Sequence, residues 1–322
     1  MSSAPSPGPA EAAPEFTLIA RHFRPLAGPE ALGLLDDAAL LTPPPGQQLV
    51  LAADAMVAGV HFLPDDPPET IGRKLLRVNL SDLAAMGATP LGYLMTIALA
   101  PGRQDAWLAG FVAGLALDQA EFGLRVLGGD TVSTPGPLSL SLTILGHVPP
   151  GAALRRVGAR PGDDLWVSGR IGDGYLGLRA ARGEIADPDG ALARRYRLPE
   201  PRIALGLGLR GLARACMDVS DGLLQDASHL CRAGDCAAEV AAALIPVSDP
   251  AAPIAALASG GDDYELLFAA APADRAAVAA AGIAARTSVT RIGRFTAGAA
   301  RVTLLDENGA DITPRKLGWS HV

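Results

Sequence analysis

The fold is decided by one stretch of ten residues, Val78-Asn79-Leu80-Ser81-Asp82-Leu83-Ala84-Ala85-Met86-Gly87. Leu76, Leu80 and Leu83 recur at helical spacing. The stretch is therefore predicted to be the second half of a helix that begins near Ile71 and buries its apolar face. Gly87 is typical of a residue that ends a helix.

Asn79, Ser81 and Asp82 are poor helix formers, placed where propensity alone would choose other residues. Asn79 and Asp82 are three positions apart, so they share a helix face beside the apolar stripe. A carboxylate at the edge of a buried stripe needs a partner, because burying it alone is costly. That partner is either a lysine or arginine, the usual case for an isolated aspartate, or a metal ion.

The composition is that of a globular protein, with 49% hydrophobic, 19% charged and 4% aromatic residues. A length of 322 residues predicts about two domains. We place the boundary at the turn Pro149-Pro150-Gly151, between an N-terminal domain, 15–150, and a C-terminal domain, 151–322. Residues 1–14 are rich in Ala, Pro and Ser and are expected to be a disordered tail.

The net charge of −7 gives no sign of a surface for nucleic acid or for an anionic membrane. No run of about 18 apolar residues occurs, and the first residues lack the basic start of a signal peptide. Cys216, Cys231 and Cys236 fit no zinc spacing and are expected to be free thiols. We therefore expect a cytoplasmic protein.

Hydrophobic periodicity predicts a mixture of strands and helices. The expected strands are 33–41, 49–53, 91–100, 125–127, 138–144, 165–168, 215–219, 265–270 and 302–305. The expected helices are 15–24, 71–86, 106–121, 175–181, 203–213, 223–233 and 272–281. Apolar residues alternate with small polar ones in 138–144, which is typical of an antiparallel strand with one buried face.

Six aspartates lie at strand ends or on the inward face of a helix. They are Asp37, Asp54, Asp82, Asp130, Asp218 and Asp221. Several have a simpler interpretation when taken singly: Asp54 can cap a turn, Gly-Gly-Asp at 128–130 is more often a turn, and Ser220 or Asp221 can be the N-cap of a helix. Asp218, set among apolar residues, is not explained by capping.

Pooled carboxylates repel one another unless cations bind, and hard oxygen ligands suit Mg²⁺, which usually also takes phosphate oxygens. The pattern therefore predicts a Mg²⁺-dependent enzyme of phosphates. Phosphoryl transfer needs alignment and charge neutralisation rather than covalent chemistry, so no nucleophile or acid–base residue is assigned. Neither a dinucleotide fingerprint nor a P-loop occurs, so a nucleotide site must be built another way. Arg155, Arg156 and Arg160 are either a solvated basic loop or a phosphate clamp.

Six motifs, in order, resemble those of the thiamine-monophosphate kinase family. They are Asp36-Asp37-Ala38-Ala39-Leu40-Leu41, Val57-Ala58-Gly59-Val60-His61-Phe62, Asn79-Leu80-Ser81-Asp82-Leu83-Ala84-Ala85-Met86-Gly87-Ala88, Gly128-Gly129-Asp130-Thr131, Asp218-Val219-Ser220-Asp221-Gly222-Leu223 and Gly260-Gly261-Asp262-Asp263-Tyr264-Glu265-Leu266. Each is weak alone, but the set is highly specific and covers the chain from about residue 16. Relatives in the wider group include aminoimidazole ribonucleotide synthetase, selenophosphate synthetase and a hydrogenase maturation factor. The loop around His61 and the last motif indicate the thiamine branch.

The resemblance implies direct, in-line transfer of the γ-phosphoryl group of ATP onto thiamine phosphate, which gives thiamine diphosphate. It also implies an α+β fold with two domains. The N-terminal domain would carry a mixed or antiparallel sheet with helices, and this sheet would pair with its copy in a homodimer to form a barrel. The C-terminal domain would be an α/β domain, with the active site in the cleft between the two.

The resemblance also assigns roles to particular positions. The ligands of several Mg²⁺ ions would be Asp37, Asp54, Asp82, Asp130, Asp218 and Asp221. The residues that contact ATP would be Gly129, Asp130, Arg156 and Ser220. Thiamine phosphate would lie at His61, Asp262 and Trp319, where an aromatic ring can stack on a cationic heterocycle. On residue type alone, His61 is a loop histidine and Trp319 a packing residue.

The chain departs from the family pattern at three places. Leu35 stands where the family usually has Gly, and Ala52 and Ala53 stand where it usually has hydroxyl residues. The second change removes a side-chain metal ligand, so one Mg²⁺ site is expected to be weaker or to use a backbone carbonyl. Asp262 replaces the Glu of many members and is one methylene shorter.

Two other hypotheses remain open at this point. One is an ATP-using enzyme of the same group with a different acceptor. The other is a protein that binds Mg-nucleotide or thiamine phosphate without turnover, an idea that the loss of hydroxyls at Ala52 and Ala53 supports.

Overall fold

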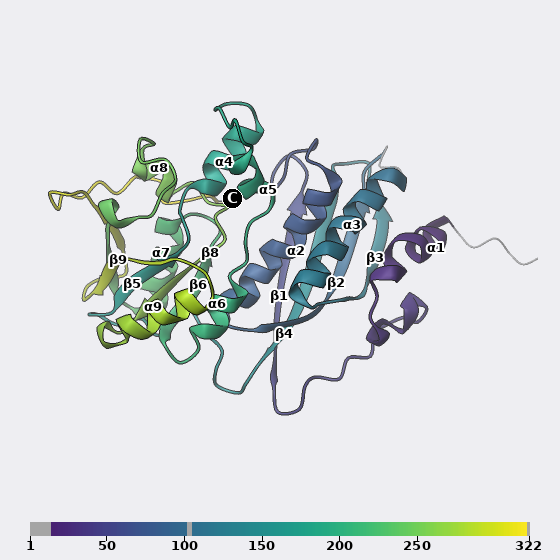
Figure 1. Ribbon diagram of the computed structural model, residues 1–322, viewed down its shortest axis with the longest axis horizontal. Coiled ribbons are helices and arrows are strands. Elements are labelled where there is room, and N and C mark those ends of the chain that lie inside the picture. Colours follow the sequence, from purple (N-terminus) through teal and green to yellow (C-terminus); the bar gives the residue numbers. More distant parts are fainter. Residues whose placement is uncertain (1–13, 102–104, 321–322) are drawn as a thin grey trace, which may run out of the picture.

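The computed structural model describes residues 14–101 and 105–320. The expected tail, 1–14, therefore lies almost wholly outside the described residues. The chain forms two halves that lie side by side, each built on its own sheet (Figure 1). The expectation of an α+β fold with two domains is confirmed by this architecture and by family models reported below. The exact boundary at 150/151 stays a prediction, and it falls in the turn between the two sheets.

The N-terminal sheet has four strands in the order β1-β4-β2-β3. Their bounds are β1 Gln48–Val57, β2 Thr89–Leu99, β3 Val126–Ser133 and β4 Ser139–Val148. Strand β4 is antiparallel to both β1 and β2, whereas β2 and β3 are parallel, so the sheet is mixed as expected. One face is covered by α2, Pro68–Ala85, and α3, Asp105–Phe122 (Figure 1). Leu140, Leu142 and Ile144 alternate into this covered face, as period 2 requires.

Helix α2 contains the stretch that decides the fold, and it touches both halves of the molecule. Gly114 of α3 lies so close to α2 that an added Cβ would stand 2.1 Å from the Glu69 carbonyl oxygen. Gly206 of α6, Ile203–Gly208, approaches the Ala84 carbonyl oxygen equally closely on the other side. After α2, Gly87 takes a left-handed φ of 62°, which confirms it as the helix stop. The helix therefore packs against α3 and α6 at close range, because glycines let the backbones approach.

The C-terminal sheet has six strands in the order β10-β7-β9-β5-β8-β6. Their bounds are β5 Asp164–Ser168, β6 Ala213–Val219, β7 Ala237–Ala241, β8 Glu265–Ala270, β9 Val289–Thr296 and β10 Val302–Leu305. Only the β10–β7 pair is parallel among these pairings. Helix α7, Leu223–Gly234, contributes to the hydrophobic core on one face of this sheet. Helices α6 and α9, Arg275–Ala284, contribute to the core on the other face. The remaining helices are α4 Asp173–Ala181, α5 Ala191–Arg197 and α8 Ile254–Ala258.

Several predicted elements differ from the structure. The strand expected at 33–41 is wrong: a 3₁₀ turn, η3 Pro29–Leu34, ends there, and irregular chain follows. Leu32 and Leu34 both have positive φ, and Leu35 is 74% exposed, so the apolar run is not buried as a strand would be. The bridge between Ala27 and Val126 pairs the segment before this stretch with the sheet, and η3 packs against β3.

Other differences concern lengths and omissions. Strand β1 continues through Asp54 to Val57, and β3 runs through Gly-Gly-Asp to Ser133, so neither aspartate ends its strand. Helix α6 stops at Gly208 rather than at 213. The expected helix at 15–24 is a short α1, Pro14–Leu18, followed by a π-helical turn, η1 Ile19–Phe23. Helix α5 and strands β7 and β9 were not predicted, because their short segments show little periodicity.

No helix among the described residues is long and apolar enough to span a membrane.

Candidate active site

Three carboxylates from three separate elements meet where the two halves touch. Asp54 comes from β1, Asp82 from α2 and Asp218 from the C-terminal end of β6. Burial, followed by the negative charges of Asp218 and Asp54, raises the pKa of Asp82 to about 8. Burial and Asp54 also raise the pKa of Asp218, whose residue is only 6% exposed. The mutual effects on pKa indicate that the three groups share one electrostatic environment, although Asp218 lies more than a hundred residues after the other two in the sequence.

The two other poor helix formers of α2 hold these carboxylates in place. Asn79 is buried, and its Oδ1 accepts a hydrogen bond from the backbone N–H of Asp54 over 3.2 Å. Ser81, also buried, donates from Oγ to Oδ2 of Asp218 over 2.7 Å. Asn79 and Ser81, although unfavourable in a helix, therefore link α2 to the two sheets through hydrogen bonds.

Neutralisation by direct ion pairs does not explain the cluster. Within 14–101 and 105–320, no ion pair within 4.0 Å joins Asp54, Asp82 or Asp218 to a lysine or arginine. Arg156 is near enough to lower the pKa of Asp82 and of Asp218, but burial and the neighbouring carboxylates outweigh it. An all-oxygen donor set of this kind fits a hard divalent cation such as Mg²⁺.

Sequence reasoning missed Asp226, which organises the loop between β6 and α7. Its Oδ2 accepts hydrogen bonds from the backbone N–H groups of Ser220, Asp221 and Gly222, over 3.1, 3.2 and 3.1 Å. Burial, then Asp218 and Asp221, raise its pKa to about 8. Its position in the first turn of α7 was the available signal, because acids are enriched there. Asp226, in the first turn of α7, thus takes the capping role that was predicted for Ser220 or Asp221.

The same loop could also hold a metal ion. Ligand atoms of Asp221, Asp226 and His229 lie within 4.8 Å of one another. Trp319 lies beside them: its backbone N–H donates to the Asp221 carbonyl over 2.9 Å, and its ring is 49% exposed. Lys316 Nζ stands 5.3 Å from the centre of that ring.

The remaining predicted metal ligands lie elsewhere. Asp37 and Asp130, together with Gly129, line a groove of about 740 Å³ between the N-terminal segment and the uncovered face of the first sheet. Asp130 pairs with Thr96, in a row that continues through Ser141 to Ala55, so it points to the uncovered face. Asp54 lies in the adjacent row on the opposite edge strand, β1, and points towards the helices. The structure thus divides the six aspartates between two places, and the single six-ligand set stays a prediction.

Two of the three predicted acceptor residues, His61 and Asp262, meet at the other end of α2, whereas Trp319 lies beside Asp221. The Val57 N–H donates to Nδ1 of His61 over 3.0 Å, so the neutral ring carries its proton on Nε2. Asp262 follows two glycines in a left-handed conformation, with a φ of 62°, and accepts from the Tyr264 hydroxyl over 3.3 Å. Lys74 of α2 contacts both residues: its Nζ donates to the His61 carbonyl over 3.0 Å and lies 3.4 Å from Oδ2 of Asp262.

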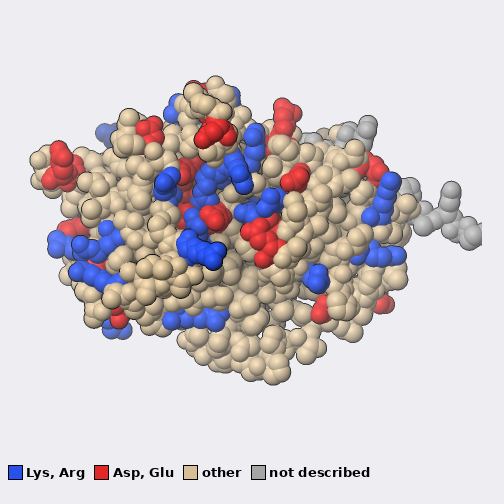
Figure 2. Space-filling model, in the orientation of Figure 1, with Lys and Arg blue, Asp and Glu red and all other residues tan. Residues whose placement is uncertain are grey.

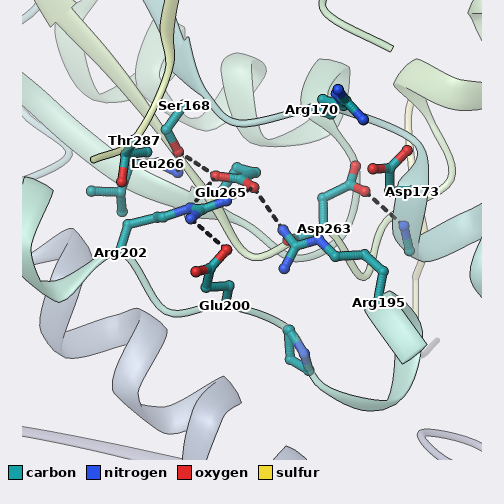
Figure 3. A network of polar contacts seen from close by, with 12 residues as sticks. Ser168, Arg170, Asp173, Arg195, Glu200, Arg202, Asp263, Glu265, Leu266 and Thr287 are labelled. Carbon is teal, nitrogen blue, oxygen red and sulfur yellow. Dashed lines mark hydrogen bonds and ion pairs between the residues drawn. The ribbon is translucent and has the colours of Figure 1, made fainter. Parts of the chain in front are cut away.

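Two other acids of the last motif have structural contacts. Glu265 is buried and bonds to Arg195, Arg202 and Ser168 (Figure 3). Asp263 is buried and accepts from the backbone N–H groups of Gly172 and Gly174, over 2.8 and 2.9 Å. These contacts fix the start of β8 against the loop before α4. Asp262 alone of the three acids is left partly open to solvent, with 30% of its side chain exposed.

Charged side chains are gathered where the halves meet. In the space-filling view, acidic and basic groups lie together midway along the long axis, with fewer over the rest of this face (Figure 2). Arg156 and Ser220, both predicted to contact ATP, are exposed. The arrangement offers carboxylates for cations, exposed cationic and hydroxyl groups for an anion, and a histidine beside Asp262 and Lys74.

Comparison with known proteins agrees with this geometry. The AIR synthase related protein N-terminal domain model matches residues 35–148, and the corresponding C-terminal domain model matches 160–304. Thiamine-monophosphate kinase of Caulobacter vibrioides is 48% identical over 97% of this chain and 92% of its own length. The chain belongs to the thiamine-monophosphate kinase family. It is therefore an enzyme, and the class inferred from the motifs is confirmed.

Members of the thiamine-monophosphate kinase family with solved structures share the whole fold. The crystal structure from Stenotrophomonas maltophilia superposes with a TM-score of 0.81 at 39% identity, covering 94% of this chain and 98% of the other. AaThiL complexed with AMPPCP and TMP superposes with a TM-score of 0.75 at 29% identity, covering 89% and 91%. The match extends over both halves, so the junction between them is common to the family.

Proposed function

We propose that this protein transfers the γ-phosphoryl group of ATP to the phosphate of thiamine phosphate, giving thiamine diphosphate and ADP. The bond between the γ-phosphorus and the bridging oxygen breaks, and a new bond forms to an oxygen of the acceptor phosphate. Family membership supports this activity, as does the relative that was solved with both AMPPCP and TMP.

The observation that carries the proposal is the trio of Asp54 and Asp82, both partly buried, with the buried Asp218. Three close carboxylates without direct cationic partners keep raised pKa values, and a bound cation would relieve their repulsion. These residues would hold Mg²⁺, with Asp221 beside them and with Asp37 and Asp130 at the groove. When bound, Mg²⁺ supplies charge neutralisation for the triphosphate and for the phosphoryl group in transfer.

The chain's own contribution is alignment. Gly129, Asp130, Arg156 and Ser220 would orient ATP, and His61, Asp262 and Trp319 would orient thiamine phosphate. The neutral His61 ring can offer its Nε2 proton to an anion, and the carboxylate of Asp262 can face the cationic thiazolium ring. No described side chain is assigned as a covalent nucleophile, so we propose a direct, in-line transfer.

The proposal includes a homodimer in the cytoplasm. Large apolar side chains are exposed on the uncovered face of the first sheet, among them Leu51, Leu94 and Val132. A second copy laid against this face would bury them and would bring the groove of Asp37 and Asp130 next to the dimer interface.

The direct test is product formation by the purified full-length protein. With ATP, Mg²⁺ and thiamine phosphate we expect equal amounts of ADP and thiamine diphosphate by chromatography, and no product after chelation of Mg²⁺. A chiral γ-phosphoryl group should emerge with inverted configuration if transfer is direct. ADP formed faster with another phosphorylated acceptor would favour a different enzyme of the group. Tight ATP binding without ADP would favour a binding protein.

A further inference from the structure

Lys74 is a buried cation at the acceptor site that no sequence motif above singles out. It lies on α2, eight residues before Asp82, and its side chain is only 3% exposed. Burial lowers its pKa, while Asp262 and Asp66 act in the opposite direction. A buried ammonium group needs several polar partners, because the loss of its hydration is costly.

Its partners come from both halves of the molecule. Nζ donates to the His61 carbonyl over 3.0 Å, on the loop that follows β1. It lies 3.4 Å from Oδ2 of Asp262, 188 residues further along, and 3.7 Å from the centre of the Tyr196 ring on α5. The Tyr196 hydroxyl in turn approaches the same His61 carbonyl at 3.4 Å. One ammonium group thus connects His61 and Asp262, two of the three predicted acceptor residues.

The Asp262 carboxylate is held at both oxygens. Oδ2 faces Lys74, and Oδ1 accepts from Tyr264, so rotation about the last side-chain bond is restricted. A second link between the halves lies nearby. Arg197 of α5 donates to Asp66, and Asp66 also accepts from the N–H of Leu63, on the loop that carries His61. Because this link contains no hydrogen bond to Lys74, it still joins the halves when Lys74 is replaced.

We propose that Lys74 is a positioning residue of the acceptor site: its ammonium group sets the His61 loop and the Asp262 carboxylate at the spacing that binds thiamine phosphate. The inference rests on the proposed function and deepens it, because it names a determinant of acceptor affinity.

Lys74→Met tests the inference, because it keeps most of the side-chain volume and removes the charge. We expect the KM for thiamine phosphate to rise by about tenfold or more, while the KM for ATP changes less than about twofold. The melting temperature should fall, since one partner of the Lys74–Asp262 pair is lost, but only modestly, because Asp262 is 30% exposed to water and keeps its bond from Tyr264. Lys74→Gln is the second variant, since its amide can still donate to His61 and stays polar if Met impairs folding.

Arg73→Met is the matched control on the same helix. Arg73 binds Asp118, which Arg77 also binds, so its loss leaves no buried charge unpaired. Both KM values should stay at the wild-type level. Equal increases in the KM for ATP and for thiamine phosphate in the Lys74 variants would assign Lys74 a purely structural role and overturn the inference.

Calorimetry with thiamine phosphate alone separates this inference from the proposed function, because it needs no turnover. Weaker binding by Lys74→Met than by wild type supports the inference even in a protein that transfers no phosphate. Equal binding by both overturns it and leaves the kinase activity standing. A wild-type protein that does not bind thiamine phosphate overturns both.

Discussion

The hydroxyl of Ser81 on α2 donates a hydrogen bond of 2.7 Å to Asp218 on β6, and this contact joins the N-terminal half to a carboxylate of the C-terminal half. Both residues are buried. The bond favours the ionised form of Asp218 and so opposes the effect of burial, which raises the pKa. Ser81, although unfavourable in a helix, thereby favours the ionised form of a proposed metal ligand.

Replacing Ser81 by Ala should weaken metal binding. Without the donor, the pKa of Asp218 rises further and less of the carboxylate is ionised at neutral pH. We expect the Mg²⁺ affinity to fall by about 10- to 100-fold, as for other residues that support ligands, and to recover in part at higher pH. Calorimetric Mg²⁺ titration measures this, with Ser139→Ala on the surface as the control. Unchanged affinity would mean that Asp218 does not bind the ion.

Asp82→Asn should abolish turnover while the fold is kept. The amide has the shape of the carboxylate but cannot supply its charge, and we expect kcat to fall by at least about 100-fold. Without Mg²⁺ at pH 9 the variant should melt above wild type, because one repelling charge is gone. Asp249→Asn, in an exposed turn, should change neither property. Wild-type rates across Mg²⁺ concentrations would remove Asp82 from the site.

Stability of the metal-free protein should depend on pH with a definite sign. The pKa of Asp82 is raised from 3.8 to about 8 by folding, so its favourable contribution is complete below pH 3.8 and is lost as the pH rises through about 8. The slope is at most about 1.4 kcal/mol per pH unit for one proton. Mg²⁺ should reverse the trend and release protons below pH 8. Calorimetry in two buffers of different ionisation enthalpy detects that release, and its absence would contradict Mg²⁺ binding at Asp82.

Trp319→Ala should affect the acceptor more than ATP. The backbone contacts to Asp221 and Gln225 remain, so only the half-exposed ring is lost. Stacking on a cationic ring predicts a KM for thiamine phosphate about tenfold higher, with little change for ATP. Trp319→Phe should restore much of the affinity. Equal changes in both KM values would identify the tryptophan as a packing residue.

Glu265→Gln should destabilise the protein without acting on the chemistry. It leaves Arg195 and Arg202 buried without their shared carboxylate, and the loss of one partner of a buried pair costs about 3–5 kcal/mol. Glu239→Gln is the control, since its pair with Arg294 is exposed and is worth under about 1 kcal/mol. Urea unfolding gives both values. A large fall in kcat of the folded variant, with unchanged stability, would move Glu265 into the active site.

The sequence predicted the central helix and its stop at Gly87 and most of the elements; of the six aspartates that it predicted to converge, Asp54, Asp82 and Asp218 share one place. It did so because apolar periodicity and turn residues act over short distances, and because an aspartate among apolar residues requires a partner. The family could also be identified from the sequence, since its motifs are runs of adjacent residues in a fixed order. Asp263 and Glu265 were visible in such a run, but their structural contacts were not.

Tertiary structure alone decided which groups are neighbours and which face they point to. Asp130 turned out to lie on the uncovered face of the sheet because β3 continues through the glycines, and strand length depends on a paired neighbour rather than on local sequence. Residues 33–41 have strand-like composition, yet they pair with no strand and stay irregular. Lys74 and Asp226 act through contacts with distant or backbone partners, which folding creates and which no linear pattern encodes.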